Sequence, residues 1–278
     1  MRLGAPLFKP FDDPDGWISA LKHHGYSAAY CPLKENNDTV LINAYAEAAQ
    51  KHNIVIAEVG AFGNNPVCPD DTIRKQGIEN CQNKLALADA IGARCCVNVA
   101  GSRSDQWAGP HENNYATEAF DLIVASVREI IDAVKPTRSF YALEMMPYML
   151  PDSPESNLEL IKAVDRKQFA VHFDPVNIIN SPRRYYDNGT LIKKCFDLLG
   201  PYIKSCHAKD ILLHNKLTVH LDEVRPGLGN LDYKTFLTEL NKLTPDTTLM
   251  IEHLKGEEEY TKAAEHIRTI AHQNNLEL

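Results

Sequence analysis

The sequence lacks any apolar stretch close to the roughly 20 residues that cross a bilayer, so we expect no membrane-spanning helix. Residues 1–8 lead directly into a strand-like pattern and lack the basic head and apolar core of a secretory signal. The seven cysteines are scattered without a C-x-x-C pair, which favours buried, reduced thiols over disulfides or a thiolate metal site. We therefore expect a cytoplasmic protein that does not bind membranes.

Positive charge is also scarce. The chain has 29 Lys and Arg against 37 Asp and Glu, a formal net charge of -8. A nucleic-acid-binding surface needs an excess of basic residues, so we expect no nucleic acid partner. Neither G-x-G-x-x-G nor G-x-x-x-x-G-K-[ST] follows a strand-like segment, which removes support for dinucleotide and P-loop folds. No Pro-, Gly- or Ser-rich linker divides the chain, and we treat residues 1–278 as a single catalytic domain.

The sequence does contain a regular alternation of short β-rich segments and longer helical segments. Strands are expected at 2–7, 27–31, 54–60, 94–100, 139–145, 169–174, 202–208 and 247–252. Helices are expected at 14–25, 39–52, 70–92, 114–135, 155–164, 189–199, 232–242 and 256–274. Eight alternating βα units predict an α/β fold, a parallel (β/α)8 TIM barrel, for which about 250 residues is typical.

Four of the expected strands end on a residue that can bind a divalent cation. These residues are Glu144, Asp174, His207 and Glu252. Because the carboxyl ends of parallel barrel strands meet at one mouth, we predict that the four side chains converge there. Three carboxylates and one imidazole suit Mn2+ first, with Mg2+, Co2+ and Fe2+ as alternatives, and leave coordination positions open for substrate oxygens.

Long connections follow several of these strands and should cover the same mouth. They span 101–113, 146–153, 175–188 and 209–231. In the first of them, Trp107 and His111 offer an aromatic face and an imidazole, which suit a sugar ring or a flat aglycone. We predict that both contact the substrate.

Further candidates lie beside the expected ligands. Asn177 is suited to bind a substrate hydroxyl, and Lys209 could neutralise negative charge that develops on a substrate, unless it forms a surface salt bridge with Asp210. His172 should point to the same side as the metal-site aspartate, where it could bind substrate, orient a ligand, carry a proton or simply be a core histidine. Glu58 could bind substrate or belong to a buried charge pair.

Together with five short motifs, the four-ligand set resembles the sugar phosphate isomerase/epimerase family within the xylose isomerase-like TIM barrel superfamily. The motifs are Gly-Ser…Trp-Ala-Gly-Pro, Phe-Asp-Pro-Val-Asn, His-Ala-Lys-Asp, Pro-Gly-Leu-Gly and Ile-Glu-His, and they span nearly the whole chain. The resemblance implies that Glu144 and Glu252 are catalytic bases as well as ligands. In ketose 3-epimerases of this superfamily, such a pair exchanges the proton next to a sugar carbonyl through a metal-stabilised enediolate.

Three positions depart from the ketose epimerase pattern. Asn177, Leu213 and Leu150 stand where those enzymes carry His, Arg and Glu. A second branch is therefore a real alternative: the catalytic subunits of bacterial C-glycoside deglycosidases, which eliminate the aglycone from a 3-oxo-C-glycoside. Apolar loop residues such as Trp107 and Tyr148 would suit an aromatic aglycone. This resemblance implies an oligomer with a small β-sandwich subunit as partner.

Two other readings remain open at this level. Endonuclease IV-like barrels act on abasic DNA, but they carry a three-metal cluster with more histidines, and the acidic charge of this chain argues against a DNA substrate. A sugar-binding barrel without catalysis is the other reading, and a pure binding protein does not need four metal ligands. The prediction is therefore a metal-dependent enzyme acting on a small sugar or glycoside.

Overall fold

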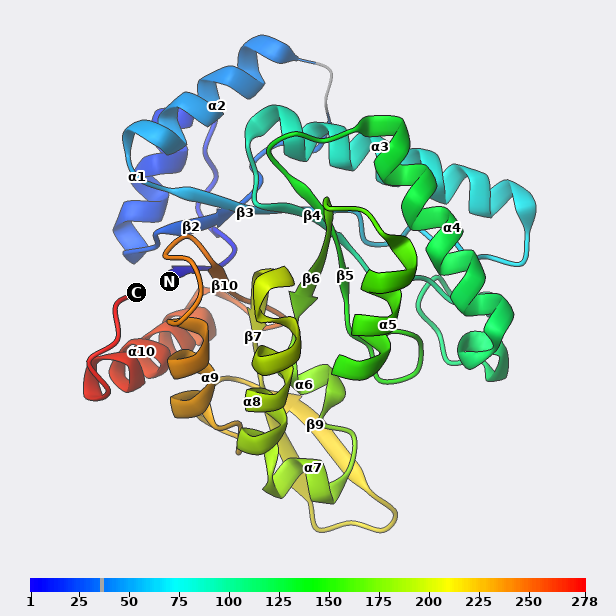
Figure 1. The fold of residues 1–278 in the computed structure, drawn as a ribbon. Coiled ribbons are helices and arrows are strands. Elements are labelled where there is room, and N and C mark those ends of the chain that lie inside the picture. The colour runs from blue at the N-terminus through cyan, green and yellow to red at the C-terminus, as the bar shows by residue number, and fades with distance from the viewer. Residues whose placement is uncertain (36–37) are drawn as a thin grey trace.

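The computed structural model describes residues 1–35 and 38–278 as a ring of parallel strands surrounded by helices (Figure 1). The ring consists of β1 (Arg2–Gly4), β2 (Ala28–Tyr30), β3 (Val55–Gly60), β4 (Cys95–Asn98), β5 (Phe140–Glu144), β6 (Phe169–Phe173), β7 (Ile203–Ala208) and β10 (Thr248–Ile251). These strands are hydrogen-bonded in the order β1-β10-β7-β6-β5-β4-β3-β2. All eight expected strands are present, and the predicted (β/α)8 TIM barrel is confirmed.

The two ends of the strand order, β1 and β2, meet through a narrow contact. The Ser27 N–H donates a hydrogen bond to the Leu3 carbonyl oxygen at 3.0 Å. Gly4 allows this approach, because a Cβ atom at this position would lie 2.4 Å from the Ala28 carbonyl oxygen. The sheet is thereby nearly closed into a barrel.

Eight main helices return the chain from one strand to the next. They are α1 (Pro14–His24), α2 (Thr39–Lys51), α3 (Asp71–Ile91), α4 (Thr117–Val134), α5 (Pro154–Val164), α8 (Asn188–Leu199), α9 (Tyr233–Leu240) and α10 (Glu257–Gln273). Asp13, Asp38, Asp70, Ser153 and Asp232 accept backbone N–H bonds at five helix starts, as N-cap residues do. All eight predicted helices are confirmed.

The connection after β6 contains local structure that the sequence did not predict. Two short helices, α6 (Pro175–Ile178) and α7 (Pro182–Tyr186), lie within the expected 175–188 loop, and both begin with proline. Single turns of 3-10 helix also occur at Glu112–Tyr115 and Gly200–Tyr202. These segments are too short to show a helical period, so composition alone could not reveal them.

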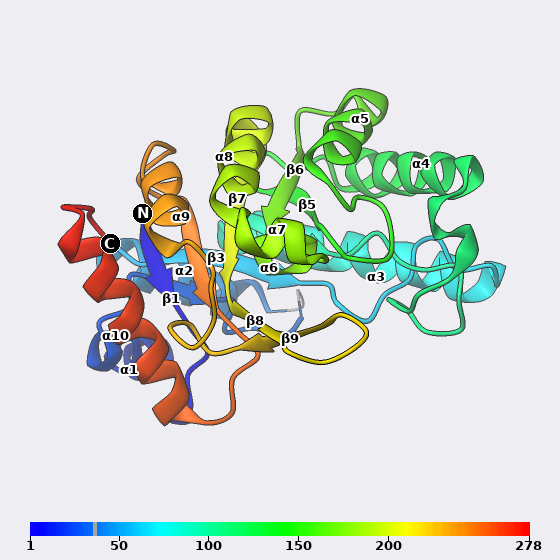
Figure 2. The same cartoon turned by 90° about the horizontal axis from the view of Figure 1, so that it is seen from below.

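The connection after β7 is a hairpin rather than the loop that we expected over 209–231. Strands β8 (Asp210–His214) and β9 (His220–Val224) pair antiparallel and project away from the ring (Figures 1 and 2). Asp210 is buried, and its carboxylate accepts the N–H groups of Gly227, Gly229 and Leu231 at 2.8–3.1 Å. The alternative of an Lys209–Asp210 surface salt bridge is therefore wrong.

Apolar side chains occupy a continuous core between the strands and the helices. Large buried members include Trp17, Tyr141, Phe173 and Phe236. All seven cysteines are free, and all except Cys31 are buried, in agreement with the expected reduced thiols. Among the described residues, no helix is long and apolar enough to cross a membrane.

The first and the last helix lie side by side at the seam of the barrel, close to both chain ends (Figures 1 and 2). The Met1 amino group donates to the Glu277 carbonyl oxygen at 3.2 Å. The Arg268 guanidinium of α10 donates to the carbonyl oxygens of His24 and Gly25, at the end of α1. Residues more than 240 positions apart thus hold this seam together.

Candidate metal centre

The carboxyl ends of four ring strands bring the expected ligands to one point. Glu144 is the last residue of β5 and His207 lies in β7, while Asp174 and Glu252 directly follow β6 and β10. One potential ligand atom from each of the four lies within 4.8 Å of the others. The parallel register of β5, β6, β7 and β10 produces this convergence, because each of these strands delivers its last side chains to the same end of the barrel.

Short contacts connect the four residues with Lys209. The Nδ1 atom of His207 lies 2.9 Å from Glu252 Oε1 and 3.4 Å from Glu144 Oε1. The ammonium group of Lys209 lies 2.8 Å from Asp174 Oδ2 and 2.6 Å from Glu252 Oε1. All five side chains are buried or nearly so, with Glu252 the most exposed at 13%. The cluster is a dense, mostly anionic site that attracts positive charge.

The titration behaviour of these groups reflects that excess of negative charge. Burial alone would lower the pKa of His207, but the carboxylates of Glu252, Glu58 and Glu144 outweigh it and raise that pKa well above its usual value. Burial likewise opposes the charge of Lys209, yet Asp174 and Glu252 raise its pKa. Both cationic groups are therefore stabilised by carboxylates that would otherwise be buried without compensation.

The donor atoms also fit a bound cation. Asp174 Oδ2, His207 Nδ1 and Glu252 Oε1 are buried and have no well-directed hydrogen bond within the described part of the chain. Their ion-pair contacts with one another and with Lys209 do not replace such hydrogen bonds, and a divalent cation would satisfy all three at once. Three carboxylates and one imidazole match the ligand preferences of Mn2+ and Mg2+. The residues present thus fit a divalent metal.

Beneath the cluster, Glu58 supports His207 from the barrel interior. Glu58 Oε1 lies 3.3 Å from His207 Nε2, on the opposite side of the imidazole from the cluster. The other carboxylate oxygen accepts the Ser205 hydroxyl at 3.0 Å, and Ser205 in turn accepts the Thr248 hydroxyl at 2.9 Å. If a metal replaces the Nδ1 proton while Nε2 donates to Glu58, the lone pair of Nδ1 would be directed toward the cluster.

His172 occupies the same interior layer. It is fully buried, its Nδ1 lies 3.5 Å from Glu58 Oε2, and its ring lies edge-on to His207 with centroids 3.9 Å apart. Neither His172 nor Glu58 lines the hollow above the cluster. Of the alternatives for Glu58, the buried charge pair is the one that the contacts show. His172 packs against a ligand rather than facing a substrate.

A hollow of about 520 Å³ opens directly above the cluster. Its lining comprises Phe62, Val99, Trp107, Ala108, Glu144, Met146, Pro147, Tyr148, Asn177, Lys209, Glu223, Glu252 and His253. Trp107, Asn177 and Lys209, which we predicted to contact substrate, are therefore among the residues that line this hollow. His111 is not among the lining residues: its Nδ1 accepts the Asn113 N–H at 3.2 Å and begins a 3-10 turn.

The lining is divided into a polar and an apolar side. Asn177 donates to Glu144 Oε1 at 2.9 Å, beside the cluster. On the apolar side, Phe62 and Trp107 meet edge-on with ring centroids 6.4 Å apart, and Tyr148 is partly exposed nearby. A ring-shaped ligand would thus have carboxylates on one side and aromatic surface on the other.

Two titratable lining residues, Glu223 and His253, were not predicted from the sequence. Glu223 reaches the site from β9, with its carboxylate 3.5 Å from Lys209 Nζ and 3.1 Å from His253 Nδ1. His253 has a positive φ of 60°, an uncommon conformation for a non-glycine residue. Its position next to Glu252 was a usable signal, whereas Glu223 could be placed only by recognising the hairpin.

Comparison with known proteins agrees with this architecture. The sequence model described as xylose isomerase-like TIM barrel matches residues 14–270. The chain belongs to this family. Its members share the barrel, and the family assignment by itself leaves the substrate of this chain open.

Solved structures show the same fold over almost the whole chain. D-psicose 3-epimerase from Clostridium cellulolyticum H10 has a TM-score of 0.71 at 15% identity, covering 99% of this chain and 100% of its own. The 3-keto-D-glucoside 4-epimerase from E. coli has a TM-score of 0.68 at 12% identity, covering 97% and 99%. A family protein from Mycobacterium smegmatis, in complex with magnesium, has a TM-score of 0.66 at 16% identity, covering 94% and 89%. At these identities the likeness establishes the fold alone.

Proposed function

We propose that this protein is a divalent-metal-dependent sugar isomerase or epimerase that removes a proton from the carbon next to a sugar carbonyl. The observation that carries the proposal is the convergence of Glu144, Asp174, His207 and Glu252 beneath an open hollow at the barrel mouth. These four residues would hold the metal, with Mn2+ the first candidate. When bound, the metal supplies electrostatic polarisation of the substrate carbonyl, which acidifies the neighbouring C–H bond.

The two glutamates are placed to act as bases from different sides. Glu144 belongs to β5 and Glu252 follows β10, and strands β6 and β7 separate them in the barrel. One carboxylate takes the proton as the C–H electron pair moves into the carbonyl, leaving negative charge on its oxygen. Return of a proton from the other carboxylic acid, on the opposite face of that carbon, gives the epimer.

Neighbouring polar groups control this chemistry. Asn177 holds Glu144 by a 2.9 Å hydrogen bond and thereby orients its second oxygen. The ammonium group of Lys209, 2.6 Å from Glu252 Oε1, provides positive charge next to the site where the carbonyl oxygen becomes negative. Burial raises the pKa of Glu252, but His207 and Lys209 outweigh it and lower that pKa, so this carboxylate begins the reaction ionised.

Several of the solved neighbours are named as sugar epimerases, which supports this proposal. A different neighbour, the family protein from Mycobacterium smegmatis, was determined in complex with magnesium. A simple phosphorylated ketose is a weaker candidate substrate than an uncharged sugar. Within the described lining of the hollow, no arginine is present to bind a phosphate group. Leu150 and Leu213, which stand where epimerases carry Glu and Arg, pack against the core instead.

The apolar side of the hollow favours a second candidate function. The aromatic surface of Phe62, Trp107 and Tyr148 would suit the aglycone of a 3-oxo-C-glycoside. The same base would remove the proton beside the 3-oxo group. The enolate would then break the C–C bond to the aglycone, whose departing carbon takes a proton from the other carboxylic acid. This alternative includes a small β-sandwich partner subunit, as in the deglycosidase branch.

The two functions are separated by NMR in D2O. Mn2+-loaded protein is incubated with free ketoses, ketose phosphates, 3-oxo-glucosides and 3-oxo-C-glycosides, while deuterium incorporation and aglycone release are followed together. Deuterium at the carbon beside the carbonyl, with a new sugar and no cleavage, is the expected result. Aglycone release would support the second function instead. If metal content is verified and no panel member exchanges a proton, the proposal of proton abstraction from these sugars is overturned.

A further inference from the structure

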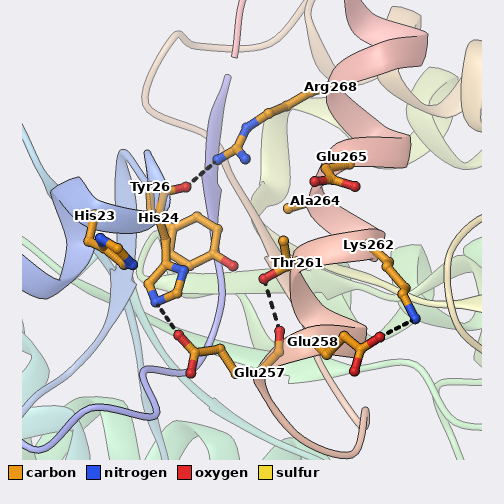
Figure 3. Close-up of a pocket in the computed structure, with 10 residues that line it drawn as sticks. All are labelled: His23, His24, Tyr26, Glu257, Glu258, Thr261, Lys262, Ala264, Glu265 and Arg268. Atoms are coloured by element: carbon orange, nitrogen blue, oxygen red, sulfur yellow. Dashed lines mark hydrogen bonds and ion pairs between the residues drawn. The ribbon is translucent and has the colours of Figure 1, made fainter.

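A second group of potential metal ligands lies outside the barrel, between its first and last helices. His23 and His24 are in the last turn of α1, and Glu257 is the first residue of α10. One ligand atom from each lies within 4.8 Å of the other two. They border a surface hollow of about 810 Å³ (Figure 3), which shares no lining residue with the hollow above Glu144. We propose that these three residues bind a transition-metal ion that bridges α1 and α10.

The geometry of the trio suits a tetrahedral ion. His24 Nε2 lies 3.3 Å from Glu257 Oε1 (Figure 3). Two ligands that each lie 2.0–2.1 Å from a tetrahedral Zn2+ are about 3.4 Å apart, so the pair needs little movement to bind one ion. The His23 ring is edge-on to His24 with centroids 5.0 Å apart, and it is exposed, so it has room to rotate toward the same point. A water molecule can take the fourth position.

Packing around His24 holds this ligand in position before a metal binds. Its ring stacks on Tyr26 with centroids 5.4 Å apart and planes 21° apart. The Arg268 guanidinium lies over the Tyr26 ring at 5.7 Å and donates to the His24 carbonyl oxygen at 2.8 Å.

The local charges are compatible with a bound cation. The carbonyl groups at the end of α1 carry the negative end of the helix dipole, which favours positive charge there. The nearest ammonium in the hollow, that of Lys262, is already paired with Glu258 at 2.7 Å and Glu259 at 3.1 Å. The Arg268 guanidinium donates to backbone carbonyl groups, as described above.

The ligand types predict which ions bind. Two imidazoles and one carboxylate favour Zn2+, Cu2+, Ni2+ and Co2+, whereas Mg2+ and Ca2+ prefer oxygen ligands. This preference is the reverse of that at the barrel mouth, where carboxylates outnumber the imidazole. Because an ion at the outer site binds helices from opposite ends of the chain, it should stabilise the folded state by mass action.

The test uses residues 1–278 with Asp174→Asn as background, which disables the site at the barrel mouth. Zn2+ binding is measured by isothermal titration calorimetry, and thermal unfolding is followed with and without Zn2+. His23→Gln and Glu257→Gln each remove one proposed ligand; His23 is exposed, so its replacement should not disturb folding. His272→Gln, an exposed histidine in the last turn of α10, is the matched control.

We expect one Zn2+ per chain in the background variant, accompanied by a higher Tm. Each ligand variant should weaken Zn2+ binding at least tenfold and abolish most of the Tm increase, while His272→Gln retains both. Mg2+ should produce no comparable effect. Equal Zn2+ affinity in the ligand variants and the background would overturn the proposal, as would a Kd weaker than about 0.1 mM, a range of adventitious binding. Circular dichroism of each variant excludes unfolding as the cause of a loss.

Discussion

The two halves of the barrel differ in what their strand ends contribute to the site. In the second half, β5, β6, β7 and β10 deliver Glu144, Asp174, His207 and Glu252 to one point. In the first half, the segments after β3 and β4 contribute apolar lining such as Phe62 and Trp107. The donors for the proposed chemistry therefore come from the second half, whereas the first half, together with Tyr148 after β5, shapes the hollow above them.

Glu58 is the exception that connects the two halves. It belongs to β3, in the first half, but its carboxylate lies 3.3 Å from His207 of β7 and accepts the Ser205 hydroxyl. It reaches these residues through the interior of the barrel rather than through the hollow. A carboxylate thus faces the hollow or supports a potential metal ligand depending both on the strand to which it belongs and on its position along that strand.

The largest loss of activity is expected when one of the four potential metal ligands of the second half is replaced. We expect Glu144→Gln to lower kcat by about 10²–10⁴-fold, because the amide cannot accept the substrate proton. The NMR exchange assay measures this loss, and an unchanged Tm would show that the fold is retained. Glu129→Gln, an exposed replacement on α4, should retain full activity. Exchange in Glu144→Gln within threefold of wild type would remove Glu144 from the mechanism.

The second test concerns Glu58, the residue of the first half that supports His207 from the barrel interior. Glu58→Gln preserves the shape of the side chain but removes the charge next to His207 Nε2, so the affinity for Mn2+ should fall by about 10–100-fold. Metal titration measures the affinity, and the visible spectrum of a Co2+-substituted sample reports the ligand geometry. Activity at saturating Mn2+ should largely recover. Unaltered affinity and spectrum would mean that Glu58 contributes only to folding.

A smaller effect is expected for Trp107, the first-half residue that we propose contacts substrate. Trp107→Ala removes aromatic surface from the hollow and should raise KM by about fivefold to tenfold, or about 1–1.4 kcal/mol, with kcat and metal affinity nearly unchanged. Trp107→Phe should retain most of the binding. A large fall in kcat with constant KM would contradict the division of labour between the two halves.

The smallest effect is expected at His111, which also belongs to the first half. Its side chain lies outside the hollow and accepts the Asn113 N–H, so His111→Ala should change kcat/KM by less than about twofold, as is usual for surface substitutions. Steady-state kinetics with the best substrate of the NMR panel provides the measurement. A tenfold decrease would show that the loop containing His111 moves onto the substrate.

The alternation of strands and helices was accessible from the sequence because it depends on local patterns. Helix starts carry their own capping residues, and strands are short runs of apolar and β-branched residues between them. The convergence of Glu144 and Glu252 could also be predicted, since parallel topology determines where strand ends meet. The β8–β9 hairpin was missed because its strands lack an alternating apolar pattern and contain charged residues such as Asp222 and Glu223.

The sequence by itself determined the (β/α)8 architecture and the set of acidic and imidazole donors, because both follow from residue type and spacing along the chain. Only the tertiary structure decided which candidates act together. It placed Glu58 and His172 beneath the site, His111 outside it, and Glu223 and His253 at its rim. Those placements depend on side-chain direction and on contacts between distant segments, and no local pattern encodes either.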